Sequence, residues 1–124
     1  MSVIRSEKTE YLRVLYNFSC GYCGITELEA GGTLTRDHFK PLTKGGRNSV
    51  DNMVYACADC NRAKGDYFGD TPATRLLHPL RDNLSAHLAR DEQGMCCPLS
   101  ALGAIYIQVL NLDRASSLKS RCST

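Results

Sequence analysis

The sequence predicts a small α+β domain in which two cysteine pairs hold a hairpin and the helix that follows it. Pairs with two intervening residues stand at Cys20/Cys23 and at Cys57/Cys60. Between them, short apolar runs alternate with glycine and proline breaks, as in short strands joined by turns. At 124 residues and 43% hydrophobic residues, the chain is long enough for one compact core.

The predicted elements of the first half follow in chain order. Apolar residues recur at helical spacing over residues 7–18, which indicates an opening helix with a broad buried face. A short strand begins at residue 33 and leads to 37–38, and residues 53–56 form the returning strand. The second cysteine pair opens a short helix over residues 57–64, which Gly65 ends.

The second half changes character beyond Pro72. We expect a hairpin around residues 91–94 and a final helix capped by Ser100, with one apolar face made by Leu102, Ile105, Tyr106, Val109 and Leu110. Residues 1–124 are thus expected to be a single domain, with a core at about 18–68 and a C-terminal extension at about 72–124.

The two cysteine pairs predict a structural zinc site, because two such turns supply the tetrahedral sulfur set that zinc prefers. The 33 residues between Cys23 and Cys57 exceed the gap of a simple finger, so zinc would clamp the ends of a hairpin. The alternative is a set of buried thiols without metal. The other three cysteines, Cys96, Cys97 and Cys122, lack ligand spacing and are expected to be plain thiols.

The expected cellular compartment and the net charge restrict the possible functions less than the cysteine pairs do. The first ten residues lack the apolar run of a secretory signal, and no stretch is long enough to span a bilayer, so we expect a soluble cytoplasmic protein without membrane contact. Seven cysteines in such a compartment favour metal ligation over disulfides. The net charge is +2, with an excess of +3 in residues 36–64, which agrees with a nucleic-acid partner without requiring one.

The segment inside the cysteine clamp carries the most specific motifs. In order, they are Cys-X-X-Cys, Asp37-His38-X-X-Pro, Gly-Gly, Asp-Asn52-Met-Val and Cys-X-X-Cys-Asn61-X-X-Lys. Over residues 20–66 the chain resembles the HNH endonucleases, a branch of the His-Me finger or ββα-metal nucleases. The resemblance implies a ββα-metal core with a structural zinc site of four cysteines, flanked here by the opening helix and the extension.

The same resemblance implies a role for four residues. His38 would be the general base, Asp37 and Asn61 would bind the catalytic metal, and Asn52 would order the loop that holds His38. An imidazole can accept a proton from water near neutral pH. A hard cation on oxygen ligands neutralises the charge that builds on the phosphate and the departing oxygen, and Mg²⁺ or Mn²⁺ fits that task.

Three details refine the expected site. Asp37 and His38 are neighbours, so they can share a site only where the strand ends or bulges. If His38 used Nε2 toward water, its Nδ1 proton would need an acceptor, most simply a backbone carbonyl near Asn52. Asn61 stands where some HNH members have histidine, which makes this an HNN variant and favours oxygen-preferring ions over zinc.

Several basic residues flank the motif. Lys44, Arg47, Arg62 and Lys64 are candidate phosphate contacts, although each alone is a common kind of surface charge. The extension resembles that of some HNH proteins more loosely and could add DNA contacts from Arg81 or Arg90. His78 and His87 are expected to be structural and stay outside the catalytic set.

The leading hypothesis is therefore a divalent-metal-dependent endonuclease that hydrolyses DNA, leaving by resemblance a 5′-phosphate and a 3′-hydroxyl. A second hypothesis is a zinc-stapled nucleic-acid or protein binding module with a vestigial site. A third is a toxin that degrades RNA or DNA, which the fold also supports. The chain is expected to act as a monomer or homodimer, and one active centre per monomer predicts nicking.

Overall fold

The computed structural model describes residues 6–114. The helices are α1 (Glu7–Leu15), α2 (Glu27–Ala30), α3 (Ala58–Lys64) and α4 (Ala101–Leu110). The strands are β1 (Thr35–His38), β2 (Met53–Ala56), β3 (Leu88–Arg90) and β4 (Cys96–Pro98), and single 3₁₀ turns are η1 (Leu42–Lys44), η2 (Val50–Asn52) and η3 (Leu84–Ala86). The expected α+β class and the ββα order of its core are confirmed.

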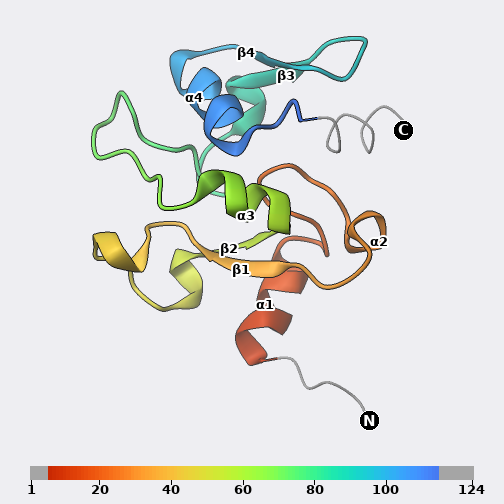
Figure 1. The fold of residues 1–124 in the computed structure, drawn as a ribbon, viewed down its shortest axis with the longest axis vertical. Helices are drawn as coiled ribbons and strands as arrows, with labels where there is room; N and C mark the ends of the chain where they lie inside the picture. The colour runs from red at the N-terminus through yellow and green to blue at the C-terminus, as the bar shows by residue number, and fades with distance from the viewer. Residues whose placement is uncertain (1–5, 115–124) are drawn as a thin grey trace.

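The β1–β2 ribbon is the centre of the core. The strands are antiparallel, with Thr35 opposite Ala56 at one end and His38 opposite Met53 at the other. Figure 1 shows α1 on one side of this ribbon and α3 on the other, with α4 and the β3–β4 hairpin beyond α3. All four residues of β2 are buried, because the ribbon is covered on both faces.

The opening helix is shorter than expected and buries less. It ends at Leu15, because Asn17 and Phe18 adopt positive φ angles of 55° and 58° that turn the chain toward the first cysteine pair. The broad buried face is wrong: Leu12 and Tyr16 are buried, whereas four other apolar residues are exposed, namely Tyr11, Val14, Leu15 and Phe18. The hydrophobic spacing located the helix but overestimated how much of it the small ribbon can cover.

The short helix α2, absent from the sequence-based expectations, anchors the loop before β1 to the core. Glu27 accepts two hydrogen bonds from the Arg13 guanidinium, both 2.7 Å long. The same carboxylate accepts from the hydroxyl of Tyr55, which in turn accepts from the Leu34 amide at 2.8 Å. This chain of polar contacts fixes the start of β1 against β2.

The extension forms the expected hairpin and final helix. Ser100 caps α4 by accepting from the Gly103 amide at 3.0 Å. Gly103 meets the hairpin so closely that a Cβ there would lie 2.0 Å from the His87 carbonyl oxygen. Tyr106 is fully buried and donates from its hydroxyl to the Tyr22 carbonyl at 2.8 Å. The extension is therefore joined directly to the turn of the first cysteine pair.

A compact turn at residues 78–82 lies near the start of the extension. The His78 ring packs against Phe39, with ring centroids 4.6 Å apart, and its Nδ1 accepts from the backbone amides of Leu80 at 3.1 Å and Arg81 at 3.3 Å. Burial, together with the nearby Arg81 charge, lowers the pKa of His78 from 6.5 to about 4. The expected structural role of this histidine agrees with these contacts.

Among residues 6–114, no helix has the length and apolar character needed to cross a membrane.

We predict that His78 makes the fold sensitive to acid. Its pKa is lower in the folded chain than in the unfolded one, so the unfolded chain takes up a proton first as the pH falls. The stability that His78 contributes above about pH 6.5 is therefore lost as the pH falls toward about 4, with a limit near 3 kcal/mol. Urea unfolding at several pH values measures this loss.

The matched variant is His78→Asn, whose amide oxygen can accept the same two backbone bonds but does not titrate in this range. Its stability should change less between pH 6.5 and pH 4 than that of the parent chain. Parallel curves for the two proteins would contradict the assignment.

Candidate active site

Four sulfur atoms join the turn before β1 to the start of α3. Cys20, Cys23, Cys57 and Cys60 are all buried, and their Sγ atoms lie within 4.8 Å of one another. The Cys23 and Cys57 sulfurs are 3.7 Å apart. A tetrahedron with zinc–sulfur bonds of about 2.3 Å has sulfur–sulfur edges of about 3.8 Å, so this donor set fits a zinc ion.

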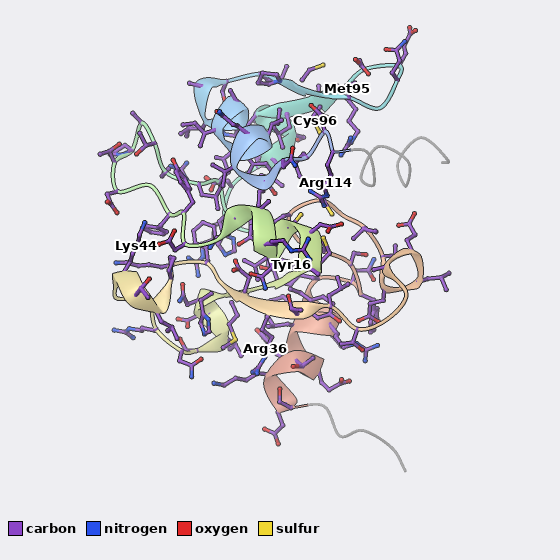
Figure 2. The ribbon with its side chains drawn as sticks, viewed as in Figure 1. Tyr16, Arg36, Lys44, Met95, Cys96 and Arg114 are labelled. Carbon is purple, nitrogen blue, oxygen red and sulfur yellow. The ribbon has the colours of Figure 1, made fainter. Side chains whose placement is uncertain are left out.

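The cluster also has an outer partner from the extension. Arg114 donates from Nη2 toward the sulfurs of Cys60 at 3.4 Å and Cys57 at 3.7 Å, and its Nε lies 3.7 Å from Asp59. Figure 2 shows Arg114 reaching back from beyond α4 toward the sulfur atoms at α3. A guanidinium placed there offsets negative charge on thiolates.

Asp37, His38 and Asn61 meet at one open pocket. Its volume is about 340 Å³, and its other lining residues are Arg36, Pro41, Leu42, Thr43 and Gly65. The pocket thus lies between the end of β1, the loop after it and the C-terminal half of α3. Because β1 ends at His38, two neighbouring residues reach the same pocket, as the sequence required.

Two donors hold one oxygen of the Asp37 carboxylate. Its Oδ2 accepts from the Tyr22 hydroxyl at 2.6 Å and lies 3.3 Å from Nζ of Lys64. Burial raises the pKa of Asp37 above its usual range, against the opposite pull of Lys64 and Tyr22. Oδ2 is engaged in this way, and Oδ1 accepts no hydrogen bond from the residues that the structure describes.

The expected phosphate contact from Lys64 is wrong, because this residue is not on the surface. Its side chain is completely buried, with Nζ donating to the His38 carbonyl at 3.1 Å as well as facing Asp37. Burial lowers the pKa of Lys64, and the Asp37 carboxylate opposes that shift. Lys64 is an internal cation that ties the end of α3 to the end of β1, and it is absent from the surface that could meet a polyanion.

His38 is oriented by a side chain that the sequence did not indicate. Its Nε2 lies 2.9 Å from Oδ1 of Asn48, in the loop between η1 and η2. The sequence analysis considered Nε2 toward water with Nδ1 on a backbone carbonyl near Asn52; in the structure Nε2 is the bonded nitrogen, and its partner is an amide side chain. In the tautomer that donates from Nε2 to Asn48, Nδ1 keeps its lone pair.

Asn61 is oriented from β1. Its Nδ2 donates to Oγ1 of Thr35 at 3.2 Å, and Thr35 itself donates to the Ala56 carbonyl at 2.9 Å. The amide nitrogen is thereby used within the fold. The amide oxygen of Asn61, the atom that a hard cation prefers, is left for the pocket.

Asn52 fastens the loop that follows His38. Its Oδ1 accepts from the Lys40 amide at 2.9 Å, and its Nδ2 donates to the carbonyls of Lys40 at 2.9 Å and Arg47 at 2.8 Å. Gly46 permits this closure, because a Cβ there would lie 1.8 Å from the Lys40 carbonyl oxygen. One side chain thus closes both ends of the 40–47 loop.

The remaining candidate cations are on the surface. Lys44, Arg47 and Arg62 are exposed, and Figure 2 shows Lys44 at the outer edge of the η1 turn. Arg62 forms an exposed ion pair with Asp59 at 3.2 Å. Arg36, which the sequence analysis did not single out, is also exposed and lines the Asp37 pocket.

The sequence analysis also named several residues of the extension, some of which are exposed and some partly buried. Arg81 is exposed and bonded to the Asp51 carbonyl, whereas Arg90 bonds to the Gly94 carbonyl at 2.6 Å inside the hairpin. His87 contacts Ser100, with 2.6 Å between Nδ1 and Oγ. Cys96 and Cys97 are partly buried thiols, and Cys122 lies outside the described residues.

Four supporting residues escaped the sequence analysis, namely Tyr22, Thr35, Asn48 and Arg114. Tyr22 sits inside the first cysteine turn and Thr35 lies two residues before Asp37, so the alternation along β1 could have indicated Thr35. Asn48 and Arg114 reach the site from loops, where no periodicity announces a contact.

Comparisons with known proteins agree with this geometry. The family model described as HNH endonuclease matches residues 20–67. The Septu protein PtuA of Bacillus mycoides (strain KBAB4) is 28% identical over 142 aligned positions, which cover 90% of this chain and 20% of that protein. The chain therefore spans a fifth of the length of this relative. No solved structure matches the chain.

The family match begins at the first cysteine of the cluster and ends three residues beyond Lys64. It therefore contains all four cysteines, both strands of the central ribbon and α3. Residues 20–67 therefore match the HNH endonuclease family, as the motifs indicated, and this segment is called the HNH domain below.

Proposed function

We propose that this protein is a divalent-metal-dependent endonuclease that hydrolyses DNA phosphodiester bonds, with His38 as the general base. The observation that carries the proposal is the convergence of Asp37, His38 and Asn61 on one open pocket. An imidazole, a carboxylate and an amide at one pocket suit general-base hydrolysis of a phosphodiester. The HNH match over the same residues supports it.

His38 performs the proton transfer in this proposal. Held through Nε2 by Asn48, it presents Nδ1 to a water molecule in the pocket and takes its proton. The water oxygen forms a bond to phosphorus while the bond from phosphorus to the 3′-oxygen breaks. Solvent supplies the proton that the departing 3′-oxygen needs, which leaves a 5′-phosphate and a 3′-hydroxyl.

Asp37 and Asn61 would hold the catalytic ion, Mg²⁺ or Mn²⁺, through Oδ1 of each side chain. Both are hard oxygen donors, which suits these ions and not a soft metal. When bound, such an ion supplies positive charge against the phosphate and the departing oxygen. Tyr22 and Lys64 keep the Asp37 carboxylate in one orientation, and Thr35 does the same for the Asn61 amide.

The surrounding residues would stabilise the site and bind the substrate. Zinc on the four cysteines would hold the turn before β1 to α3, and Asn52 would keep the loop after His38 closed. Lys44, Arg47 and Arg62 are exposed and would contact backbone phosphates. The proposal places the enzyme in the cytoplasm, where reduced thiols remain available to zinc, and one centre per chain would nick one strand.

We predict that His38→Ala cuts supercoiled plasmid at least a hundredfold more slowly than the parent with Mg²⁺ or Mn²⁺, because the general base is lost. His87→Gln, a histidine change at the α4 cap, should cut at the parent rate. Gel assays of nicked and linear plasmid measure both rates, with EDTA as the metal-free control. Equal rates for His38→Ala and the parent would remove the mechanism.

The same assay separates the alternative functions. Single-stranded DNA and structured RNA are offered beside the plasmid under each metal condition. Cleavage of RNA alone would reassign the substrate and favour the toxin hypothesis. A pure, zinc-loaded protein that binds these substrates and cuts none of them would instead be a binding module.

We predict that the purified protein contains about one tightly held zinc per chain and that Arg114→Met releases it several-fold faster to a chromogenic chelator. The guanidinium donates to two of the four sulfurs and offsets their charge, so its loss exposes the thiolates. Metal analysis and the rate of chelator colour measure this effect.

Arg62→Met is the matched control for zinc release. Arg62 pairs with the same Asp59, but it is exposed, and within residues 6–114 it forms no hydrogen bond to sulfur. It should release zinc at the parent rate. Equal release rates for the two variants would remove the role of Arg114, and a protein without zinc would remove the clamp itself.

We predict that Lys64→Met, which keeps most of the side-chain length, destabilises the zinc-loaded protein by about 3 kcal/mol. The variant leaves Asp37 buried without its cation, and breaking a buried pair from one side is costly. The double variant Asp37→Asn with Lys64→Met should recover part of the loss, because the buried charge is removed as well. Urea unfolding of the parent, the single variants Asp37→Asn and Lys64→Met, and the double variant completes this double-mutant cycle.

The exposed pair of Arg62 and Asp59 gives the comparison for this cycle, since Arg62→Met should cost less than about 1 kcal/mol. Additive losses at Asp37 and Lys64, with no coupling between them, would show that the ammonium does not stabilise the carboxylate.

A further inference from the structure

A second pocket lies on the other side of the loop that borders the active site. Its volume is about 270 Å³, and its walls are the Gly45–Gly46 turn together with Lys40, Arg47, Asp51, Asn52 and Arg81. Three cations and a single carboxylate line it, so its side chains carry a net charge of +2. We call this site the basic pocket.

Two of its cations stand on a backbone that Asn52 immobilises. The amide side chain binds the backbone of Lys40 through both its oxygen and its nitrogen, and it also binds the Arg47 carbonyl. The Gly46 amide donates to the Pro41 carbonyl at 3.0 Å, which closes the loop from inside. The positions of Lys40 and Arg47 are therefore set in advance, which lowers the entropy cost of binding an anion.

The third cation comes from the extension. Arg81 reaches back to η2 and donates from Nη2 to the Asp51 carbonyl, and its own amide is held by the His78 ring. Part of the guanidinium is thus anchored. A guanidinium has five donors, so one bond to Asp51 leaves others for an anion. The carboxylate of Asp51 is itself occupied by a hydrogen bond from Ser49.

One short loop separates the basic pocket from the active-site pocket. Pro41, Leu42 and Thr43 line the active-site pocket, whereas Lys40 and residues 45–47 line the basic pocket. An anion at each pocket would therefore lie on either side of the same few residues. A polynucleotide backbone carries a phosphate at every step, so it offers an anion to each of two neighbouring pockets.

We propose that the basic pocket binds a backbone phosphate next to the bond that is cleaved, held by Arg47 and Arg81 beside Lys40, whose ammonium lies over the Phe68 ring. The inference rests on the proposed function, since it assumes that the neighbouring pocket receives the scissile phosphate. Arginine forks match phosphate geometry with paired hydrogen bonds, and lysine adds a point charge. Arg81 thereby gives the extension a part in substrate binding.

The test compares two exposed arginines of the extension. Arg81→Gln removes a charge from the basic pocket, and Arg90→Gln removes the same charge from the β3–β4 hairpin, which Figure 1 shows beyond α3, on the side away from the β1–β2 ribbon. Binding of a fluorescent single-stranded oligonucleotide is measured by anisotropy in EDTA at several salt concentrations. Zinc content and unfolding midpoints confirm that each variant is folded.

We expect Arg81→Gln to weaken binding about fivefold and to reduce the slope of log K against log salt by about one, whereas Arg90→Gln, which lies outside the basic pocket, weakens binding by less than about twofold. Arg47→Gln should repeat the Arg81 result. Because Arg47 is exposed and its recorded bond is made by its carbonyl, this second variant keeps the fold contacts intact.

Equal effects of Arg81→Gln and Arg90→Gln, with Arg47→Gln bound as tightly as the parent, would overturn the basic pocket. Competition by polyglutamate as strong as by unlabelled oligonucleotide would also overturn the phosphate assignment. These binding measurements need no cleavage. A parent chain that cuts nothing would therefore defeat the proposed nuclease activity, while the comparison of arginine variants would still decide the pocket.

Discussion

The cluster of four sulfurs is the constraint on which the other contacts depend. The β1–β2 ribbon has only four residues in each strand, and a two-stranded ribbon of that size is marginal in water. The cysteines join the turn before β1 to the beginning of α3, so the ribbon is closed at the end where it would otherwise open. Metal-ion binding at such a site contributes folding free energy directly, which suits a chain with a small core.

The position of Asn61 follows from how α3 is fixed at both ends. Cys57 and Cys60 hold its first turn, and Lys64 ties its last residue to the His38 carbonyl and to Asp37. Asn61 lies between these two attachments and faces the same pocket as Asp37. A buried ion pair is a costly way to stabilise a fold, because both charges lose their hydration. Here it has a geometric use, since it sets the relative position of the two residues proposed to bind the ion.

The sequence predicted the features that depend on neighbouring residues and missed the contacts that depend on the tertiary fold. Cysteine spacing, short runs bounded by glycine and proline, and the cap at Ser100 located the cluster, the ribbon and α4, because each depends on neighbours in the chain. Burial of Lys64 was unpredictable, since its motif spacing is the same whether the ammonium faces solvent or Asp37. The contact between His38 and Asn48 depends on the path of a loop, and the exposed face of α1 depends on how little surface the ribbon offers.

The C-terminal extension supports three separate parts of the HNH domain. Tyr106 binds the first cysteine turn, Arg114 reaches the sulfurs at α3, and Arg81 bonds to η2 beside the loop that Asn52 closes. These contacts come from α4, from the segment after it and from the turn at residues 78–82, so they draw on both ends of the described part of the extension. If the basic pocket binds substrate as proposed, Arg81 makes nucleic-acid affinity depend on the folding of the extension, whereas the side chain of His38 is oriented by Asn48, which lies within residues 20–67.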